Sequence, residues 1–268
     1  MRRAESVRAK EPTQVRVVSY QWVRTSPGHG DAVHRTWIGG DVNPKPEEMA
    51  TTAKVARRAA TLTAGAIAGI LFSVLFTTSI VLMFTNMADL SSDTGAWLES
   101  GSGGLKLALG LIPFAGLFFL WFIAVSRERL GRFEDQFFAT VFLGSGLLFL
   151  AMVFAAAASA GAIVEAYARD PAGFVGSDTY YYARLTVSQI FNVYALRMAA
   201  VFMISLASLW MRTGVMPRWM SLLTFAVAVV LMFITSASPW IVLVFPGWVF
   251  FVSAYILVTR LRAEPSES

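Results

Sequence analysis

The longest uninterrupted apolar segment of the chain runs from Gln136 to Val164 and contains no charged residue. An α-helix rises about 1.5 Å per residue, so roughly 20 apolar residues are needed to cross a hydrocarbon core about 30 Å thick. This segment is longer than one crossing requires. The pattern therefore predicts a transmembrane helix that is tilted or that projects beyond the lipid at one end.

Further apolar segments follow the same pattern, and each is bounded by charged residues or by Gly, Pro and Ser, which are typical of loops. We therefore expect an all-α membrane protein, a six-transmembrane-helix bundle over residues 59–262. The expected spans are about 59–87, 105–125, 136–164, 190–211, 220–236 and 240–258.

The fourth of these spans is the least regular. Its strictly apolar part, residues 198–211, is too short to cross a membrane alone, so the span must begin near Ile190. That start places Asn192, Tyr194 and Arg197 inside or just under the outer leaflet.

A charged side chain at membrane depth is costly and is usually paired or functional, which makes Arg197 a candidate site residue. Glu165, at the outer end of the third span, is a candidate partner. Together with Asn192 and Tyr194, this pair would form a polar site for an anionic headgroup or a substrate carboxylate. The alternatives are that Arg197 snorkels to the interface or forms a structural ion pair.

The segment before the first span, residues 1–58, is polar and basic, with eleven Lys or Arg against six Asp or Glu. We interpret it as a cytoplasmic arm that is partly disordered. Residues rich in β-formers flank a turn-forming cluster in it, which favours a small hairpin at 15–38. Residues 263–268 form a polar tail.

The positive charges favour one side of the membrane. If six spans alternate in direction, eighteen of the twenty-two Lys and Arg residues lie on the side of both chain ends. By the positive-inside tendency that side is cytoplasmic. We therefore expect a multi-pass protein of a bacterial inner (plasma) membrane, surrounded by membrane lipids. The net charge of +5 does not indicate nucleic-acid binding, because the basic residues flank apolar spans.

Few residues could support chemistry. Cysteine is absent, which excludes thiolate nucleophiles, zinc–thiolate sites and iron–sulfur ligation. The two histidines, His29 and His34, precede the first span, so a membrane haem held by paired histidines is excluded. Ser145 lies between glycines in an apolar helix and lacks the nucleophile-elbow pattern. We expect no cofactor, no metal and no enzymatic activity.

Small and aromatic residues predict packing and anchoring. Gly65 and Gly69 are four residues apart, and Gly144 and Gly146 flank a serine, so both pairs would let another helix backbone approach closely. Whether that helix belongs to the same chain is open. The run Tyr180-Tyr181-Tyr182 is typical of an anchor at headgroup level.

Three stretches carry a resemblance to a known group of proteins. They are Phe133–Phe149 (FEDQFFATVFLGSGLLF), Phe119–Ile123 (FLWFI) and the turn Gly214–Trp219 (GVMPRW). With these stretches the chain resembles, over residues 49–262, uncharacterised actinobacterial six-span integral membrane proteins. The resemblance implies the six-helix fold and brings no activity, cofactor or catalytic residue.

Two functional hypotheses follow. The first is a non-enzymatic accessory or scaffold protein that packs against other membrane helices through its Gly and Ala faces. The second is a lipid or small anionic ligand binding or transport component that uses the outer-leaflet site described above.

Overall fold

The computed structural model describes residues 46–87, 95–100, 102–130, 136–233 and 239–263. Within these ranges all regular elements are helical. The expected hairpin at 15–38, most of the arm and the end of the polar tail lie outside the described residues. The elements are α1 (Pro46–Asn86), α2 (Ala96–Ser100), α3 (Ser102–Leu130), α4 (Gln136–Arg169), α5 (Pro171–Phe174), α6 (Asp178–Gln189), η3 (Ile190–Ala195), α7 (Leu196–Thr213), α8 (Arg218–Phe233), η4 (Pro239–Leu243) and α9 (Val244–Ala263).

Five helical stretches are long and apolar enough to cross a membrane: Thr63–Asn86, Gly103–Arg127, Phe137–Arg169, Asp178–Thr213 and Trp240–Arg260. They overlap five of the six expected spans. The remaining expected span, 220–236, corresponds to α8, which is a shorter apolar helix.

The helix of the fourth span begins before Ile190, the expected start of the span. The helix begins at Asp178 and continues through α6, η3 and α7 to Thr213. The Ser177 hydroxyl accepts a hydrogen bond from the Tyr180 amide at 3.2 Å and so caps the start of α6. The polar composition of α6 hides this helix from a search for apolar runs.

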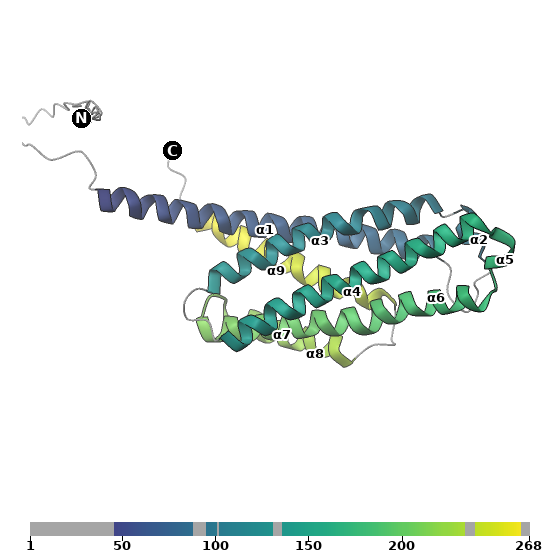
Figure 1. Ribbon diagram of the computed structural model, residues 1–268. Helices are drawn as coiled ribbons and strands as arrows, with labels where there is room; N and C mark the ends of the chain where they lie inside the picture. The colour runs from purple at the N-terminus through teal and green to yellow at the C-terminus, as the bar shows by residue number, and fades with distance from the viewer. Residues whose placement is uncertain (1–45, 88–94, 101, 131–135, 234–238, 264–268) are drawn as a thin grey trace, which may run out of the picture. The chain divides into compact units, whose positions relative to one another are not determined.

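Successive long helices run in opposite directions, so their termini gather at two ends of the bundle (Figure 1). The turn between α7 and α8 lies at one end, which we call the basic end. The arginines with described side chains there are Arg127, Arg212, Arg218, Arg260 and Arg262. The short helices α2 and α5 lie at the opposite end, which we call the cap end (Figure 1). The carboxylates with described side chains, Glu99, Glu165, Asp170 and Asp178, are all in elements at the cap end.

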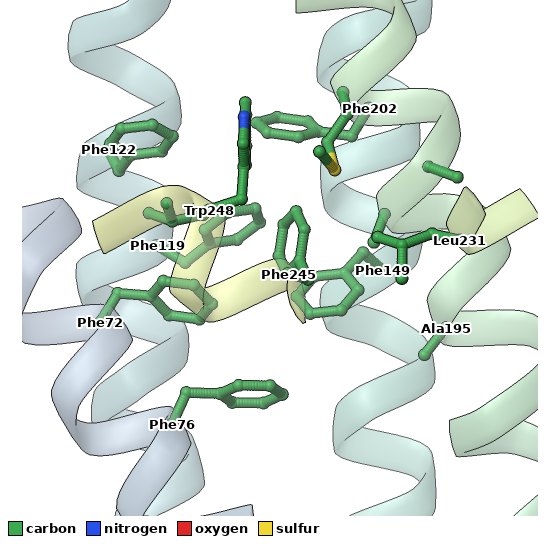
Figure 2. Close-up of a cluster of buried hydrophobic side chains, with 14 of the residues drawn as sticks. Phe72, Phe76, Phe119, Phe122, Phe149, Ala195, Phe202, Leu231, Phe245 and Trp248 are labelled. Carbon is green, nitrogen blue, oxygen red and sulfur yellow. The ribbon is translucent and has the colours of Figure 1, made fainter. Parts of the chain in front are cut away.

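The centre of the bundle is filled by aromatic rings that point toward one another from α1, α3, α4, α7 and α9 (Figure 2). Ring centroids are 4.7 Å apart in the pairs Phe72–Phe119, Phe142–Phe202 and Phe149–Phe245. Such contacts add to the dispersion energy of burial. We call this region the membrane core; its fully or almost fully buried rings include Phe72, Phe76, Phe119, Phe142, Phe149, Phe202 and Phe245.

A second, smaller cluster lies at the cap end, where α2, α5 and α6 pack against the ends of α1, α3 and α4. We call this assembly the cap. Its buried residues are Met83, Trp97, Leu98, Leu105, Ala108, Ala160, Ile163, Val164, Phe174, Tyr180 and Val187.

Helix length places the cap relative to the spans. The stretch Phe137–Arg169 has 33 residues and the stretch Asp178–Thr213 has 36. At 1.5 Å per residue they extend about 50 Å and about 54 Å, against roughly 30 Å of hydrocarbon. Both stretches are therefore longer than one crossing requires, and their excess length is sufficient to include α5 and α6 at the cap end.

Candidate functional site

The cap contains a polar aromatic cluster built on α2 and α6. Trp97 donates a hydrogen bond from Nε1 to the hydroxyl of Tyr180 at 3.1 Å. The guanidinium carbon of Arg184 lies 5.1 Å from the centroid of the Trp97 ring, within the range of a cation–π contact. Tyr180 and Arg184 are one turn apart on α6, so both reach the same indole.

The charge in this cluster is largely withdrawn from solvent. Tyr180 is 0% exposed, and Arg184 and Trp97 are each 6% exposed. Withdrawing a guanidinium from water is costly unless its surroundings compensate for the lost hydration. The indole face beneath Arg184 supplies part of this compensation, and α2 is thereby fixed against α6.

A second polar contact joins α2 to α4. The hydroxyl of Tyr167 donates to Glu99 Oε1 at 3.2 Å, in an exposed position. This contact lies at the cap surface and adds little stability, since both groups can also bind water. It nevertheless gives α2 a second attachment point.

The long helix that carries α6 and α7 contains a π-helical segment, η3. Such segments are uncommon and often occur at functional sites. The Nδ2 of Asn192 donates to the Ser188 hydroxyl at 3.2 Å, whereas its Oδ1 is buried and accepts no hydrogen bond. Just after η3, Arg197 donates from Nη1 to the carbonyl of Val193 at 3.1 Å.

The structure does not assemble the expected site of Glu165, Asn192, Tyr194 and Arg197. Glu165 instead forms an exposed ion pair with Arg169, one turn along α4, at 3.7 Å. The rings of Phe142 and Phe202 are in contact and fix the register of α4 against α7. Counted from that contact at 1.5 Å per residue, Glu165 lies roughly 27 Å farther toward the cap end than Arg197.

The structure therefore does not bring Glu165 and Arg197 together in one pocket. A fourth helix that begins near Ile190 would have placed the two residues at similar depth. Tyr194 is 57% exposed and lies on the outer surface of the bundle.

Three of the four predicted packing glycines contact helices of the same chain. A Cβ added at Gly65 would overlap Val125, and one added at Gly69 would overlap Ser253. At Gly146 an added Cβ would lie 2.8 Å from Ile123. Gly144 has open space around it and contacts no other helix through such an atom.

The tyrosine run divides in a way that the sequence did not indicate. Tyr182 is 73% exposed and Tyr181 is 42% exposed, but Tyr180 is wholly buried. The interpretation of all three as an interfacial anchor is wrong for Tyr180. The spacing of Tyr180 and Arg184 on one face of a helix was the signal that could have identified the cluster.

Among the described residues, no group of three or more His, Cys, Asp or Glu side chains could hold a metal ion. Ser145 donates to the carbonyl of Val141 at 2.6 Å within its own helix. No protein-family model matches the chain, and no curated protein and no solved structure matches it significantly.

Proposed function

We propose that this protein is a non-enzymatic accessory or scaffold protein of a bacterial plasma membrane. Its packed bundle would serve as a rigid anchor, and its cap and outer helix faces would contact another membrane protein. The observation that supports this proposal most directly is the filled aromatic interior (Figure 2).

Transport or intramembrane catalysis needs polar groups and space between the helices. Several buried hydroxyls of the spans bond to carbonyls of their own helices, as Ser73 does to Gly69 at 2.8 Å and Ser205 to Val201 at 2.8 Å. A small, largely apolar cavity near the basic end is lined in part by Gly65, Phe122 and Trp210. These features favour a structural role over a solute path.

We further propose that α8 is a sixth span and that both chain ends are cytoplasmic. With 16 residues, α8 extends about 24 Å, which a slightly thinned bilayer accommodates. The arginines gathered at the basic end and the carboxylates gathered in the cap favour the same orientation. A reporter that works only outside the cell should be active when it is inserted after Ala172. A reporter that works only inside the cell should be active when it is fused after Arg262.

Site-directed photocrosslinking in native membranes tests the scaffold role. A photoreactive amino acid is placed at two exposed positions, Tyr182 in the cap and Phe114 on α3. The buried position Phe119, also on α3, is the matched control. We expect one discrete crosslinked membrane protein from at least one exposed position and none from position 119. Crosslinks to lipid alone from both exposed positions, or solute flux through reconstituted proteoliposomes, would contradict the proposal.

A further inference from the structure

Arg197 is a charged residue within a helix that is long and apolar enough to cross a membrane, where charges are costly. It is sixteen residues before Thr213, the last residue of α7 at the basic end. At 1.5 Å per residue its Cα is therefore about 24 Å from that end, near the far boundary of a hydrocarbon core about 30 Å thick. A guanidinium at this position must either reach the boundary or find an anion.

The side chain of Arg197 extends toward the cap end. Its Nη1 donates to the carbonyl of Val193, one turn closer to the cap, at 3.1 Å. One helical turn is about 5.4 Å, so the guanidinium lies roughly 30 Å from the basic end. If the apolar layer begins at the basic end of α7, this is the depth of the phosphates of the opposite leaflet.

The Arg197 guanidinium has further N–H donors that can bind a ligand at that level. An arginine has five N–H donors, and the Val193 carbonyl accepts from only one nitrogen. Among the described residues Arg197 forms no ion pair, and the expected partner Glu165 is bound to Arg169. Arg197 is only partly buried, so an anion can approach it from the lipid side.

The π-helical segment places further polar groups beside it. In a regular α-helix, residues five apart are rotated by about 140° from each other, whereas π-helical i→i+5 bonding brings them close to one face. Asn192 and Arg197 are five apart across η3, so the segment turns them toward the same side. Asn192 in turn donates from Nδ2 to the exposed Ser188 hydroxyl and so holds that hydroxyl about one turn from the Arg197 guanidinium.

We propose that Arg197, with Asn192 and Ser188, binds the headgroup of a phospholipid in the cap-side leaflet. The phosphate accepts hydrogen bonds from the remaining guanidinium donors, in the geometry that arginine favours. A headgroup hydroxyl lies one turn above, where it reaches the exposed Ser188 hydroxyl, which Asn192 holds through its Nδ2. Phosphatidylglycerol has both the phosphate and the hydroxyls, whereas phosphatidylcholine has the phosphate without a donor.

Native mass spectrometry of the full-length protein in detergent tests this site. The probes are dioleoylphosphatidylglycerol, dioleoylphosphatidylcholine and, as the soluble source of the same phosphate, glycerol 3-phosphate. We expect Arg197→Gln to weaken phosphatidylglycerol binding roughly tenfold, the effect of losing a charge-assisted hydrogen bond. Arg169→Gln is the matched control, because Arg169 is an exposed arginine on α4 whose side chain is 78% exposed, and it should bind like the unaltered protein.

Two further variants separate the contributions. Arg197→Lys keeps the charge but not the planar fork, so we expect a loss of roughly threefold. Ser188→Ala should reduce the preference for phosphatidylglycerol over phosphatidylcholine while leaving phosphatidylcholine binding unchanged. If Arg197→Gln is not recovered folded, Arg197→Lys and the lipid preference of the unaltered protein decide the question.

Three results would overturn the inference. The first is equal phosphatidylglycerol affinity of the Arg197 and Arg169 variants. The second is the absence of any preference for phosphatidylglycerol over phosphatidylcholine in the unaltered protein. The third is full competition by glycerol 3-phosphate at the lipid's own concentration, which would assign the site to a soluble phosphate.

Discussion

The membrane core and the cap are both clusters of buried aromatic residues, but they are stabilised in different ways. In the membrane core, rings such as Phe119 and Phe245 contact one another and have no polar atom to satisfy. In the cap, the buried rings of Trp97 and Tyr180 carry polar groups that bond each other, and Arg184 lies over the indole. A buried ring next to lipid needs only shape complementarity, whereas a buried ring next to water can also hold a charge in place.

This difference has a thermodynamic reason. Lipid tails are as apolar as a phenylalanine ring, so the membrane core gains stability mainly from dispersion and close packing. In a cap that lies outside the apolar layer, withdrawing apolar surface from water contributes about 25 cal/mol per Å². Loss of packing should therefore reduce the stability of the membrane core most, and loss of a polar contact should reduce the stability of the cap.

The largest expected effect comes from emptying the membrane core. Phe119→Ala removes a ring that contacts Phe72, Phe149 and Phe202, among others, and leaves a cavity at the centre of the bundle. We expect a loss of about 3 kcal/mol, at the lower end for such truncations because the unfolded helix keeps its ring in lipid.

The measurement is tryptophan fluorescence during thermal unfolding in one detergent. Phe114→Ala, on the same helix but 59% exposed, is the control and should change stability little. Equal destabilisation by the two variants would show that the ring cluster is not the source of bundle stability.

The second-largest loss of stability is expected from a substitution that separates two helices in contact. Gly69→Val places methyl groups where the side chains of Ser253 and Phe122 already lie, so α1 must move from α9 and α3. We expect a loss of about 2 kcal/mol, typical of overpacking.

Gly247→Val on α9 provides the comparison, because an added Cβ there meets nothing within 4 Å. Both variants add the same β-branched side chain to a helix. A similar loss from both, in the same unfolding assay, would mean that helix propensity and not interhelical contact explains the result.

The smallest effect is expected in the cap. Tyr180→Phe removes the hydroxyl that accepts from Trp97 Nε1, which should cost about 1 kcal/mol. The change should appear as faster hydrogen exchange in α2 and α6, with exchange in the remaining long helices unaltered. Tyr182→Phe, at a position 73% exposed, should leave exchange in α2 unchanged. Uniformly faster exchange throughout the bundle would contradict the separation of cap and core.

The sequence allowed the membrane core to be predicted because long apolar runs leave few alternatives. Gln136–Val164 identifies α4 without knowledge of any partner helix, and the GxxxG spacing identifies Gly65 and Gly69 as close-packing positions. The sequence could not show that their partners are Val125 and Ser253, because residues far apart in the chain meet only through tertiary packing.

The cap could not be predicted in the same way. The helix α6 contains three consecutive tyrosines and several polar residues and has no apolar run, so it resembles a loop between spans. The burial of Arg184 depends on Trp97, 87 positions away in sequence. The predicted pocket of Glu165 and Arg197 is not assembled for the same reason, since the relative depth of the two residues depends on how α4 packs against α7.

The pairing of α1 with α3 has a consequence for biogenesis. These consecutive spans pack along their length, with Gly65 against Val125 near one end and the Ser79 hydroxyl donating to the Ala108 carbonyl at 2.7 Å toward the other. Nothing synthesised later is needed for these contacts. A ribosome-bound chain that has released only its first two spans to the translocon can therefore form this hairpin, which then receives α4, α7 and α9 as they emerge.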